Sequence, residues 1–131
     1  MIKNKKKEKG VLISIIIVAS KIITELFLVL WLYHFPLQRI MAEIKYNEYS
    51  KLQGVVADDI ATKKVYKDYK QGGYYVTVTY HSDSKYYYDY HYYLINFRRD
   101  GVKYHTMSCI THNLKNPLAD SYDDVKYKSL E

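Results

Sequence analysis

The chain has 131 residues and a formal net charge of +6, and 17 of its residues are Tyr. This length supports one small domain, and 48% hydrophobic residues with only 5 Gly and 2 Pro exclude general disorder and collagen-like repeats. The single Cys excludes an internal disulfide framework and a Cys-rich zinc module.

Most of the positive charge lies at the N-terminus. Residues 1–9 contain five Lys and one Glu, whereas residues 37–131 contain 14 basic and 12 acidic side chains. Nucleic-acid binding needs Lys and Arg clustered on one folded face, so we expect no nucleic-acid partner. Residues 1–10 are instead predicted to form a basic cytoplasmic tail.

An apolar stretch of 25 residues follows at positions 11–35. As a helix it would be roughly 37 Å long, which exceeds the roughly 30 Å of a bilayer's hydrocarbon core. Lys residues precede it, and Trp31, Tyr33 and His34 end it, as the positive-inside and aromatic-belt patterns require. We predict a single-pass helix of the cell membrane, with the N-terminus cytoplasmic and residues 36–131 extracytoplasmic.

This stretch has two other interpretations. In a cleavable signal peptide, Val11–Val18 would be the apolar core and Val18-Ala19-Ser20 the cleavage region, but Ile22–Tyr33 would then stay exposed on the product. A buried helix of a soluble protein is disfavoured because 95 further residues are too few to enclose it. Lipid attachment is not expected, since the only Cys is Cys109.

Lys21 and Glu25 interrupt the apolar stretch. They lie four residues apart, so they share one helical face and can pair. Each charge near mid-membrane costs about 2.5–3.5 kcal/mol on insertion scales, which pairing partly offsets. One interpretation is a contact face for another membrane helix, and the other is a self-neutralised pair.

An amphipathic helix is predicted at residues 37–53, directly after Pro36. Apolar residues recur there at helical spacing and are expected to cover a sheet: Leu37, Ile40, Met41, Ile44 and Leu52. Gly54 is a suitable stop, and residues 55–60 read as a connecting loop.

The rest of the pattern has the two-residue period of β-strands. Strands are predicted at residues 62–69, 74–81, 86–97 and 102–110, with Gly-containing or polar turns between them. Ile95 and Phe97 suggest a bulge in the third strand, and residues 111–131 an irregular tail along an edge. The predicted fold class is α+β: a transmembrane helix that continues into an amphipathic helix packed on a four-stranded antiparallel β-meander.

Several segments together resemble a known family. They follow a short basic tail, a membrane helix and an amphipathic helix, and they are Asp59–Lys64, Gly72–Tyr80, Tyr86–Tyr93 and Lys126–Glu131. The pattern resembles a Gram-positive family of small membrane-anchored proteins, the domain-of-unknown-function family three-one-three-nine. This resemblance implies the same topology and a place in the bacterial envelope, and it assigns no activity.

The strand Tyr86–Tyr93 is the most unusual segment. Alternation places one row, expected to face the core, at Tyr86, Tyr88, Tyr90 and Tyr92, and the other at Tyr87, Asp89, His91 and Tyr93. The second row is the candidate binding surface, because rigid rings beside an acid and a His suit sugars, peptides or a protein partner. The alternative is that both rows only stabilise the sheet through cross-strand aromatic pairs.

Catalytic residues, metal ligands and cofactors are not predicted. The four His of the domain (His81, His91, His105 and His112) have no metal-ligand spacing, although His91 and His105 could lie opposite each other. Cys109 lacks an acid partner and an oxyanion-hole motif for thiolate chemistry with His105 or His112. The pairs Asp58-Asp59 and Asp123-Asp124 are expected to be solvated.

These inferences favour a non-enzymatic binding module of the envelope, which meets an unknown protein or cell-wall polymer through its Tyr-rich sheet. A second hypothesis is an accessory subunit of a membrane complex, acting through the helix that carries Lys21 and Glu25. A third and weaker one is an enzyme that uses Cys109 with a nearby His.

Overall fold

A computed structural model describes residues 1–116 and 124–130 of the chain. The chain divides into two compact units, Met1–Pro36 and Leu37–Glu131. The first is helical, and the second contains a helix and a sheet.

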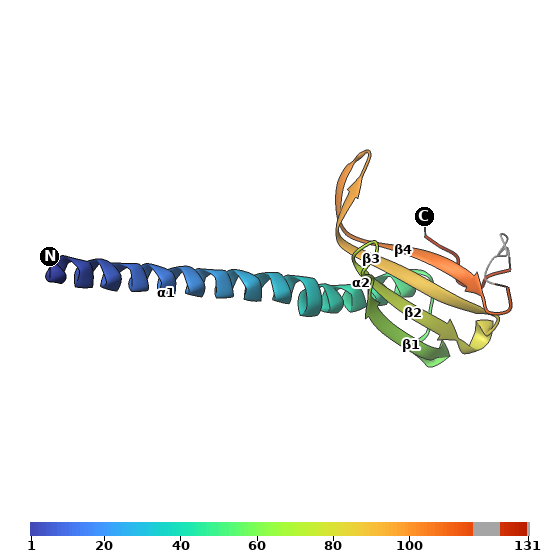
Figure 1. The fold of residues 1–131 in the computed structure, drawn as a ribbon. Helices are drawn as coiled ribbons and strands as arrows, with labels where there is room; N and C mark the ends of the chain where they lie inside the picture. Colours follow the sequence, from blue (N-terminus) through green and yellow to red (C-terminus); the bar gives the residue numbers. More distant parts are fainter. Residues whose placement is uncertain (117–123, 131) are drawn as a thin grey trace. The chain divides into compact units, whose positions relative to one another are not determined.

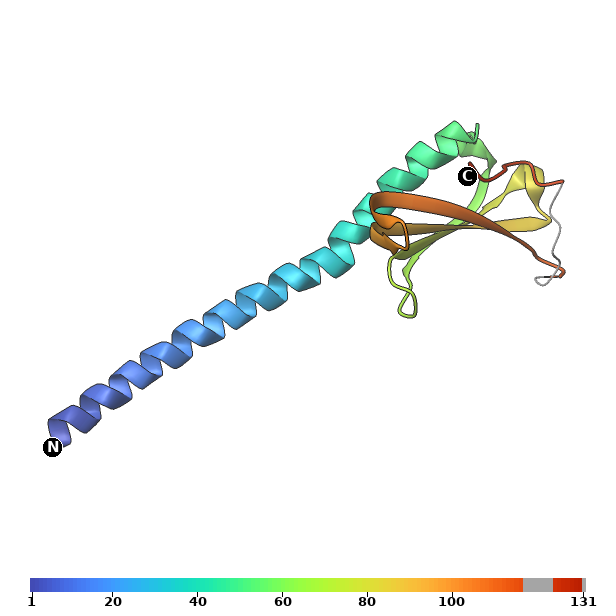
Figure 2. The ribbon, with the colours of Figure 1, turned by 90° about the horizontal axis from the view of Figure 1, so that it is seen from above.

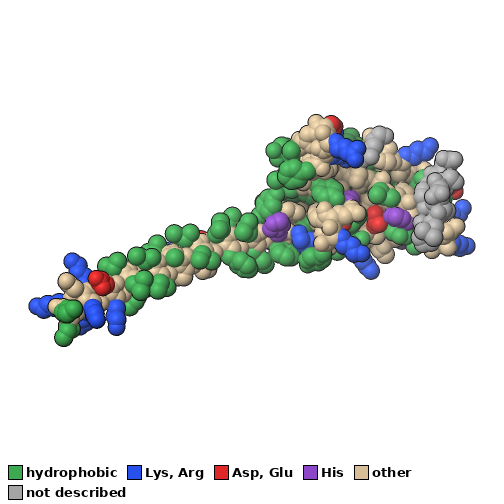
Figure 3. Space-filling model, turned by 45° about the horizontal axis from the view of Figure 1, so that its top comes forward, with side chains coloured by type: hydrophobic (Ala, Val, Ile, Leu, Met, Phe, Trp, Pro, Cys, Tyr) green, Lys and Arg blue, Asp and Glu red, His purple; other side chains and the backbone are tan. Residues whose placement is uncertain are grey.

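The first unit is dominated by helix α1, Ile2–Leu32, in which every residue is exposed. Hydrophobic side chains cover it beyond a Lys-rich beginning (Figure 3). Among the described residues, the helical stretch Ile2–Leu52 is the one long and apolar enough to cross a membrane, with a mean hydropathy of 2.3 in its most apolar window. Signal sequences share this length and composition. The predicted basic tail is part of this helix from Ile2 onward.

A π-helical turn, η1, Tyr33–Leu37, surrounds Pro36. Proline has no backbone N–H to donate to the preceding turn, and its ring crowds a carbonyl there in a regular α-helix. A local π-helical turn relieves this conflict without ending the helical path. Regular α-helix resumes at Gln38.

In the second unit, helix α2, Gln38–Leu52, packs on one face of a four-stranded antiparallel sheet (Figures 1 and 2). The strands lie in chain order: β1 Ile60–Lys67, β2 Tyr74–Tyr80, β3 Tyr86–Arg98 and β4 Gly101–Asn113. The α+β meander is therefore confirmed. The predicted boundaries differ most at β4, which continues three residues past position 110, and at β1, which begins at Ile60 instead of Thr62.

The face of α2 that meets the sheet is not the predicted one. Its buried side chains include Ala42, Tyr46 and Tyr49, spaced i, i+4, i+7. The predicted stripe was wrong, because most of its members are 45–71% exposed: Leu37, Ile40, Ile44 and Leu52. Tyr is favoured at this interface because the facing strands bury Tyr rings, whose hydroxyls need polar partners.

The core beneath α2 consists mostly of Tyr rings. The largest fully buried side chains are Tyr46, Tyr80, Tyr88, Tyr90, Tyr92, Val76 and Val78. Tyr46 and Tyr49 each meet the ring of Tyr90 edge-on, with centroids 4.9 and 5.7 Å apart. The prediction that the even-numbered Tyr row of β3 faces the core is confirmed.

The hydroxyls of this core form one chain of hydrogen bonds. Tyr90 donates to the side-chain oxygen of Gln53 at 2.8 Å, so it accepts from Tyr80 at 2.8 Å, and Tyr80 accepts from Tyr46 at 3.0 Å. Gln53 in turn donates to the carbonyl of Lys128 at 3.0 Å. Burial raises the pKa of Tyr80 and Tyr90 far above the ordinary value, so both stay protonated donors. In the described part of the chain, no buried side-chain nitrogen or oxygen lacks a partner.

The pairing of β3 with β4 keeps one register from Tyr86↔Asn113 to Arg98↔Gly101. The bulge predicted near Ile95 and Phe97 is therefore wrong. A register shift occurs instead in β1, between Ile60 and Thr62. The constant register of β3 keeps Ile95 and Phe97 in the same alternating row as Tyr93.

Residues 124–130 return to α2 and do not follow a sheet edge, so the predicted edge tail is wrong for this segment. Tyr127 is 4% exposed, and its ring packs edge-on against Tyr80 with a centroid distance of 4.6 Å. The backbone N–H of Leu130 donates to the hydroxyl of Tyr49 at 2.9 Å. Of the predicted tail, residues 117–123 lie outside the described residues, Asp123 included.

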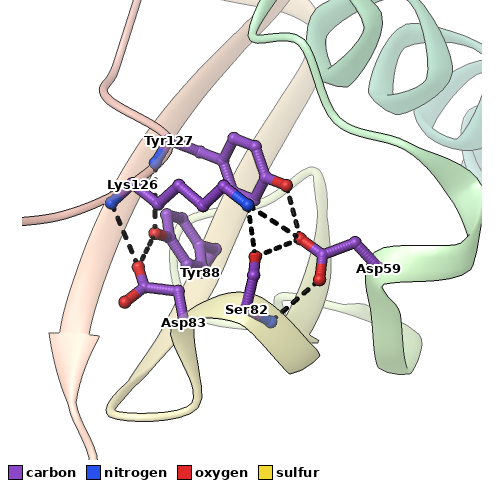
Figure 4. A network of polar contacts seen from close by, with 6 residues as sticks. All are labelled: Asp59, Ser82, Asp83, Tyr88, Lys126 and Tyr127. Carbon is purple, nitrogen blue, oxygen red and sulfur yellow. Dashed lines mark hydrogen bonds and ion pairs between the residues drawn. The ribbon is translucent and has the colours of Figure 1, made fainter.

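Asp59 holds this segment in place (Figure 4). Its carboxylate accepts hydrogen bonds from the backbone N–H of Ser82 at 2.8 Å and from the hydroxyls of Ser82 and Tyr127, and Lys126 Nζ lies 3.8 Å away. We call these four residues the Asp59 clasp. The hydrogen bonds from Ser82 and Tyr127 lower the pKa of Asp59 to about 2. The expectation that Asp59 is merely solvated was wrong, since it joins three segments of the chain.

The hydroxyl chain predicts a specific cost for Tyr90→Phe. This change leaves the oxygen of Gln53 and the hydroxyl hydrogen of Tyr80 without partners in the core, which should destabilise the domain by about 1–3 kcal/mol. Tyr104→Phe is the matched control, because Tyr104 is 70% exposed and should change stability little. Denaturant unfolding of the full chain in detergent measures both. Equal midpoints for the two variants would contradict the assigned role of the hydroxyl chain.

The Asp59 clasp predicts a pH-dependent contribution to stability. Because the pKa of Asp59 is lower in the folded state, its contribution is complete above the ordinary pKa of 3.8 and is lost as pH falls toward 2. Asp59→Asn should therefore lower Tm at neutral pH, and its difference from wild type should vanish near pH 2. The exposed neighbour Asp58 provides the control Asp58→Asn, which should match wild type throughout. A Tm difference independent of pH would refute a role for the carboxylate charge.

Candidate functional site

The candidate row of β3 lies on the sheet face opposite α2, which we call the open face. Tyr87, Asp89 and Tyr93 are half-buried there, and His91 is only 5% exposed. Neighbours on the same face, and not a covering helix, account for this burial. The structure thus places all four predicted residues on one surface and fits them between side chains of the adjoining strands.

An aromatic ladder crosses three strands of the open face. It consists of Tyr66 on β1, Tyr75 on β2, and His91 and Tyr93 on β3. Tyr66 stacks on Tyr75 with centroids 5.5 Å apart, Tyr75 on His91 at 4.1 Å, and Tyr93 leans on His91 at 4.2 Å. The register pairs Tyr66 with Tyr75 and Tyr75 with His91, so the ladder follows directly from strand pairing.

His91 is held in a fixed orientation at the centre of this ladder. Its Nε2 lies 2.9 Å from the carbonyl of Gly72, which can only accept, so Nε2 carries the proton. The carboxylate of Asp68 lies 3.8 Å from the same nitrogen. The turn must come close to β3 to make these contacts: a Cβ on Gly73 would lie 2.1 Å from the carbonyl oxygen of Tyr92.

Asp68 shapes that turn. Its Oδ1 accepts from the backbone N–H groups of Lys70 at 2.8 Å and Gln71 at 3.2 Å. Desolvation acts to raise the pKa of Asp68, but these two N–H groups and the nearby His91 outweigh it, and the pKa is lowered. Asp68 therefore stays an acceptor beside the ladder at neutral pH.

A second group surrounds Asp89. Its carboxylate accepts from the hydroxyl of Thr77 at 2.6 Å and lies 3.3 Å from Nε2 of His112. The ring of His112 stacks on Tyr87 with a centroid distance of 4.8 Å. The hydroxyl of Tyr66 lies 3.3 Å from Thr77 Oγ1, which connects this group to the ladder. The open face thus presents ring faces beside a carboxylate, a hydroxyl and the imidazole of His112, while His91 is buried within the ladder.

The open face has the features of a contact surface. Aromatic rings offer flat apolar area with little conformational entropy to lose, and the polar groups between them give direction to hydrogen bonds. Tyr66 remains 47% exposed, so the ladder ends in an accessible ring. Sugars, peptides and protein surfaces all have groups that stack on such rings.

The structure does not bring the four His of the domain together. His91 pairs with Ser108 on the open face, while His105 Nδ1 lies 2.8 Å from the hydroxyl of the core residue Tyr92. The suggested opposition of His91 and His105 is therefore wrong. Across residues 1–116 and 124–130, no three His, Cys, Asp or Glu side chains converge as metal ligands would.

Cys109 lies in the core beside Tyr90. It is 9% exposed, and burial raises the pKa of its thiol to about 12. A thiol in that environment stays protonated at neutral pH. Cys109 therefore packs as a small apolar side chain, out of reach of a second chain.

Lys21 and Glu25 lie one turn apart on α1, and both are exposed. No ion pair joins them in the described structure, in which the ion pairs lie in the second unit. Their role as a membrane-helix contact stays a prediction.

Several residues of the open face escaped the sequence analysis: Tyr66, Tyr75, Thr77, Asp68 and the stacked His112. The signal that could have found Tyr75 is its odd-numbered place in the clear alternation of β2. Tyr66 and His112 needed the pairing register, which sets Tyr66 opposite Tyr75 and, in a β4 longer than predicted, His112 opposite Tyr87.

Comparison of the chain with protein families finds one matching model, described as a protein of unknown function (DUF3139), over residues 6–90. Comparison with curated proteins finds no significant match, and comparison with solved structures finds none either. The matched region includes α1 from Lys6 onward, α2, β1, β2, and β3 as far as Tyr90, so it contains Tyr87 and Asp89 but ends before His91 and Tyr93. Because this match covers well over half of the chain, the protein belongs to the DUF3139 family.

Proposed function

We propose that the protein is a membrane-anchored, extracytoplasmic binding module of the Gram-positive envelope, and not an enzyme. In this proposal α1 crosses the cell membrane with its Lys-rich beginning in the cytoplasm. The apolar, fully exposed α1 supports the anchor, and the charge asymmetry supports the orientation. Residues 37–131 then lie outside, where the open face meets a protein or a cell-wall polymer.

The observation that carries this proposal is the aromatic ladder with the Asp89 group beside it. Stacked rings on the solvent side of a sheet offer a rigid contact area, whereas the stability of the domain already rests on the Tyr core under α2. The buried, protonated thiol of Cys109 and the structural use of Asp59 argue for contact over catalysis.

The proposal is tested with purified cell-wall sacculi as the probe. Full-length protein in detergent should sediment with the sacculi. The double variant Tyr87→Ala, Tyr93→Ala should lose affinity by about tenfold or by a larger factor, as expected for loss of aromatic contact residues. Tyr87→Phe, Tyr93→Phe keeps the rings and should retain binding. Tyr69→Ala removes a ring that is 80% exposed on the β1–β2 turn, and it should bind like wild type.

Photocrosslinking on intact cells examines a protein partner in the same way. A photoreactive residue in place of Tyr66 should give a discrete adduct that the double Ala variant loses. Unchanged sedimentation and unchanged adducts in the double Ala variant, with its unfolding midpoint near wild type, would contradict the proposal.

A second candidate function is an accessory subunit of a membrane complex that acts through α1. Its support is the charge pattern: Lys21 and Glu25 stand within a segment otherwise suited to lipid, at a cost of about 2.5–3.5 kcal/mol each if unpaired near mid-membrane. Partner charges on another helix would offset this cost.

This second function makes its own prediction. Replacing Lys21 and Glu25 by Leu should dissociate any complex that crosslinking detects within the membrane. The adducts formed by the photoreactive residue at position 66 should persist. Exchanging the two residues (Lys21→Glu, Glu25→Lys) keeps the charges and their spacing, and it serves as the control for self-pairing. If the Leu variant keeps the complex, the helix is an anchor alone.

A further inference from the structure

Strands β3 and β4 continue beyond the rest of the sheet as a two-stranded arm. The pairing of β2 with β3 ends at Tyr74↔Tyr92, whereas β3 and β4 stay paired from Tyr93↔Thr106 to Arg98↔Gly101. Figures 1 and 2 both show this hairpin leaving the sheet beside the beginning of α2. We call residues 93–106 the arm.

One side of the arm is apolar and exposed. Ile95 pairs with Tyr104, and Phe97 pairs with Val102, so alternation places all four side chains on the same side. Their exposed fractions are 37% for Ile95, 80% for Phe97, 45% for Val102 and 70% for Tyr104. A two-stranded hairpin with an uncovered apolar side is marginal in water, and such a patch usually marks a contact surface.

The arm also carries positive charge near its tip. Arg98, Arg99 and Lys103 are exposed there, with Asp100 as the only acidic side chain of the arm. Lys103 and Asp100 lie 3.8 Å apart, so the two Arg side chains are the uncompensated charges. The arm thus combines an apolar side with a basic tip. This combination fits a surface that has anionic groups next to an apolar layer.

The base of the arm is fixed to α2. His105, at the base of the arm, has a left-handed backbone with φ +53, and its ring contacts the hydroxyl of Tyr92 and, at 4.0 Å, the carboxylate of Glu48. These contacts fix the base of the arm. The arm itself leaves the sheet at the end of the domain where α2 begins (Figures 1 and 2).

That end of the domain is the one that the chain enters from α1. Leu37, the last residue of η1, follows Pro36 directly, and Leu37 together with Ile40 and Ile44 on the first two turns of α2 is 45–57% exposed. A few residues of chain can span only a few ångströms each, so this end is tethered close to the bilayer if α1 crosses it. Several apolar side chains of α2 and of the arm thus lie within reach of the same surface.

From these observations we infer that the arm inserts its apolar side, Ile95, Phe97, Val102 and Tyr104, into the headgroup region of an anionic lipid bilayer. This inference rests on the proposed membrane anchor. Arg98 and Arg99 contact lipid phosphates, and the rings of Tyr104 and Phe97 occupy the interfacial layer that aromatic side chains favour. The second contact, besides α1, fixes how the domain stands on the membrane.

The experiment uses full-length protein reconstituted in vesicles that contain anionic lipids with brominated acyl chains, which quench nearby indoles. Wild type reports on Trp31, the only Trp of the chain. The variant Trp31→Phe, Phe97→Trp reports on the arm. Its control is Trp31→Phe, Leu114→Trp, because Leu114 is 54% exposed at the other end of β4, beside Lys85.

We expect the indole introduced at position 97 to lose more than half of its emission to the bromolipid, and the indole at position 114 to lose none. Adding Arg98→Gln and Arg99→Gln, or replacing the anionic lipid with a neutral one, should reduce the quenching at position 97. Quenching of Trp31 without quenching at position 97 overturns the inference and leaves the membrane anchor standing.

Other outcomes are equally decisive. If Trp31 itself is not quenched, the proposed anchor fails and the arm inference falls with it. If the indole at position 97 shifts to shorter wavelength with protein concentration but is not quenched, a second copy of the chain covers the arm, and lipid is excluded as its occupant. If quenching at position 97 is as strong in neutral as in anionic lipid, the assigned contact of Arg98 and Arg99 with anionic lipid is wrong.

Discussion

Each Tyr ring buried in this domain brings a hydroxyl that must find a partner away from water. The domain meets this requirement with a directed chain from Tyr46 through Tyr80 and Tyr90 to Gln53 and the carbonyl of Lys128. Beyond the packing of the rings, these directed bonds fix one position of α2 on the sheet. The requirement also explains why α2 faces the sheet with Tyr46 and Tyr49 and leaves Ile40 and Ile44 in the open.

Strand β3 contributes to both faces of the sheet because aromatic residues occupy its even-numbered and its odd-numbered positions. The even-numbered rings lie under α2, where their hydroxyls join the core network. On the opposite side, the imidazole ring of His91 lies between Tyr75 and Tyr93 and adds an N–H donor that the turn carbonyl of Gly72 orients. The same strand therefore gives the domain its stability and supplies most of its candidate binding surface. Changes on the open face can alter recognition while the core stays intact.

The order of the elements could be predicted from the sequence, because hydrophobic period and Gly-containing turns are local signals. Most of the errors came from interactions between distant segments. The apolar stripe of α2 was misplaced because period alone cannot reveal that the opposing surface is made of Tyr. Asp59 was expected to be solvated, since its partners Ser82 and Tyr127 are far along the chain. On the open face, the residues of β3 could be predicted from the alternation of the strand alone. Their neighbours on the other strands could not, because their positions depend on the register between strands.

The packing of residues 127–130 against the core has a consequence for the order in which the domain is made. The hydrogen bond from Gln53 to the carbonyl of Lys128 spans 75 residues, and the one from the N–H of Leu130 to Tyr49 spans 81 residues. The hydroxyl chain ends on the carbonyl of Lys128. A chain that emerges from its N-terminus onward cannot close this core until those late residues arrive. Until then the Tyr rings of β3 lack part of their cover. The core of the domain thus closes only once residues 127–130 have been made.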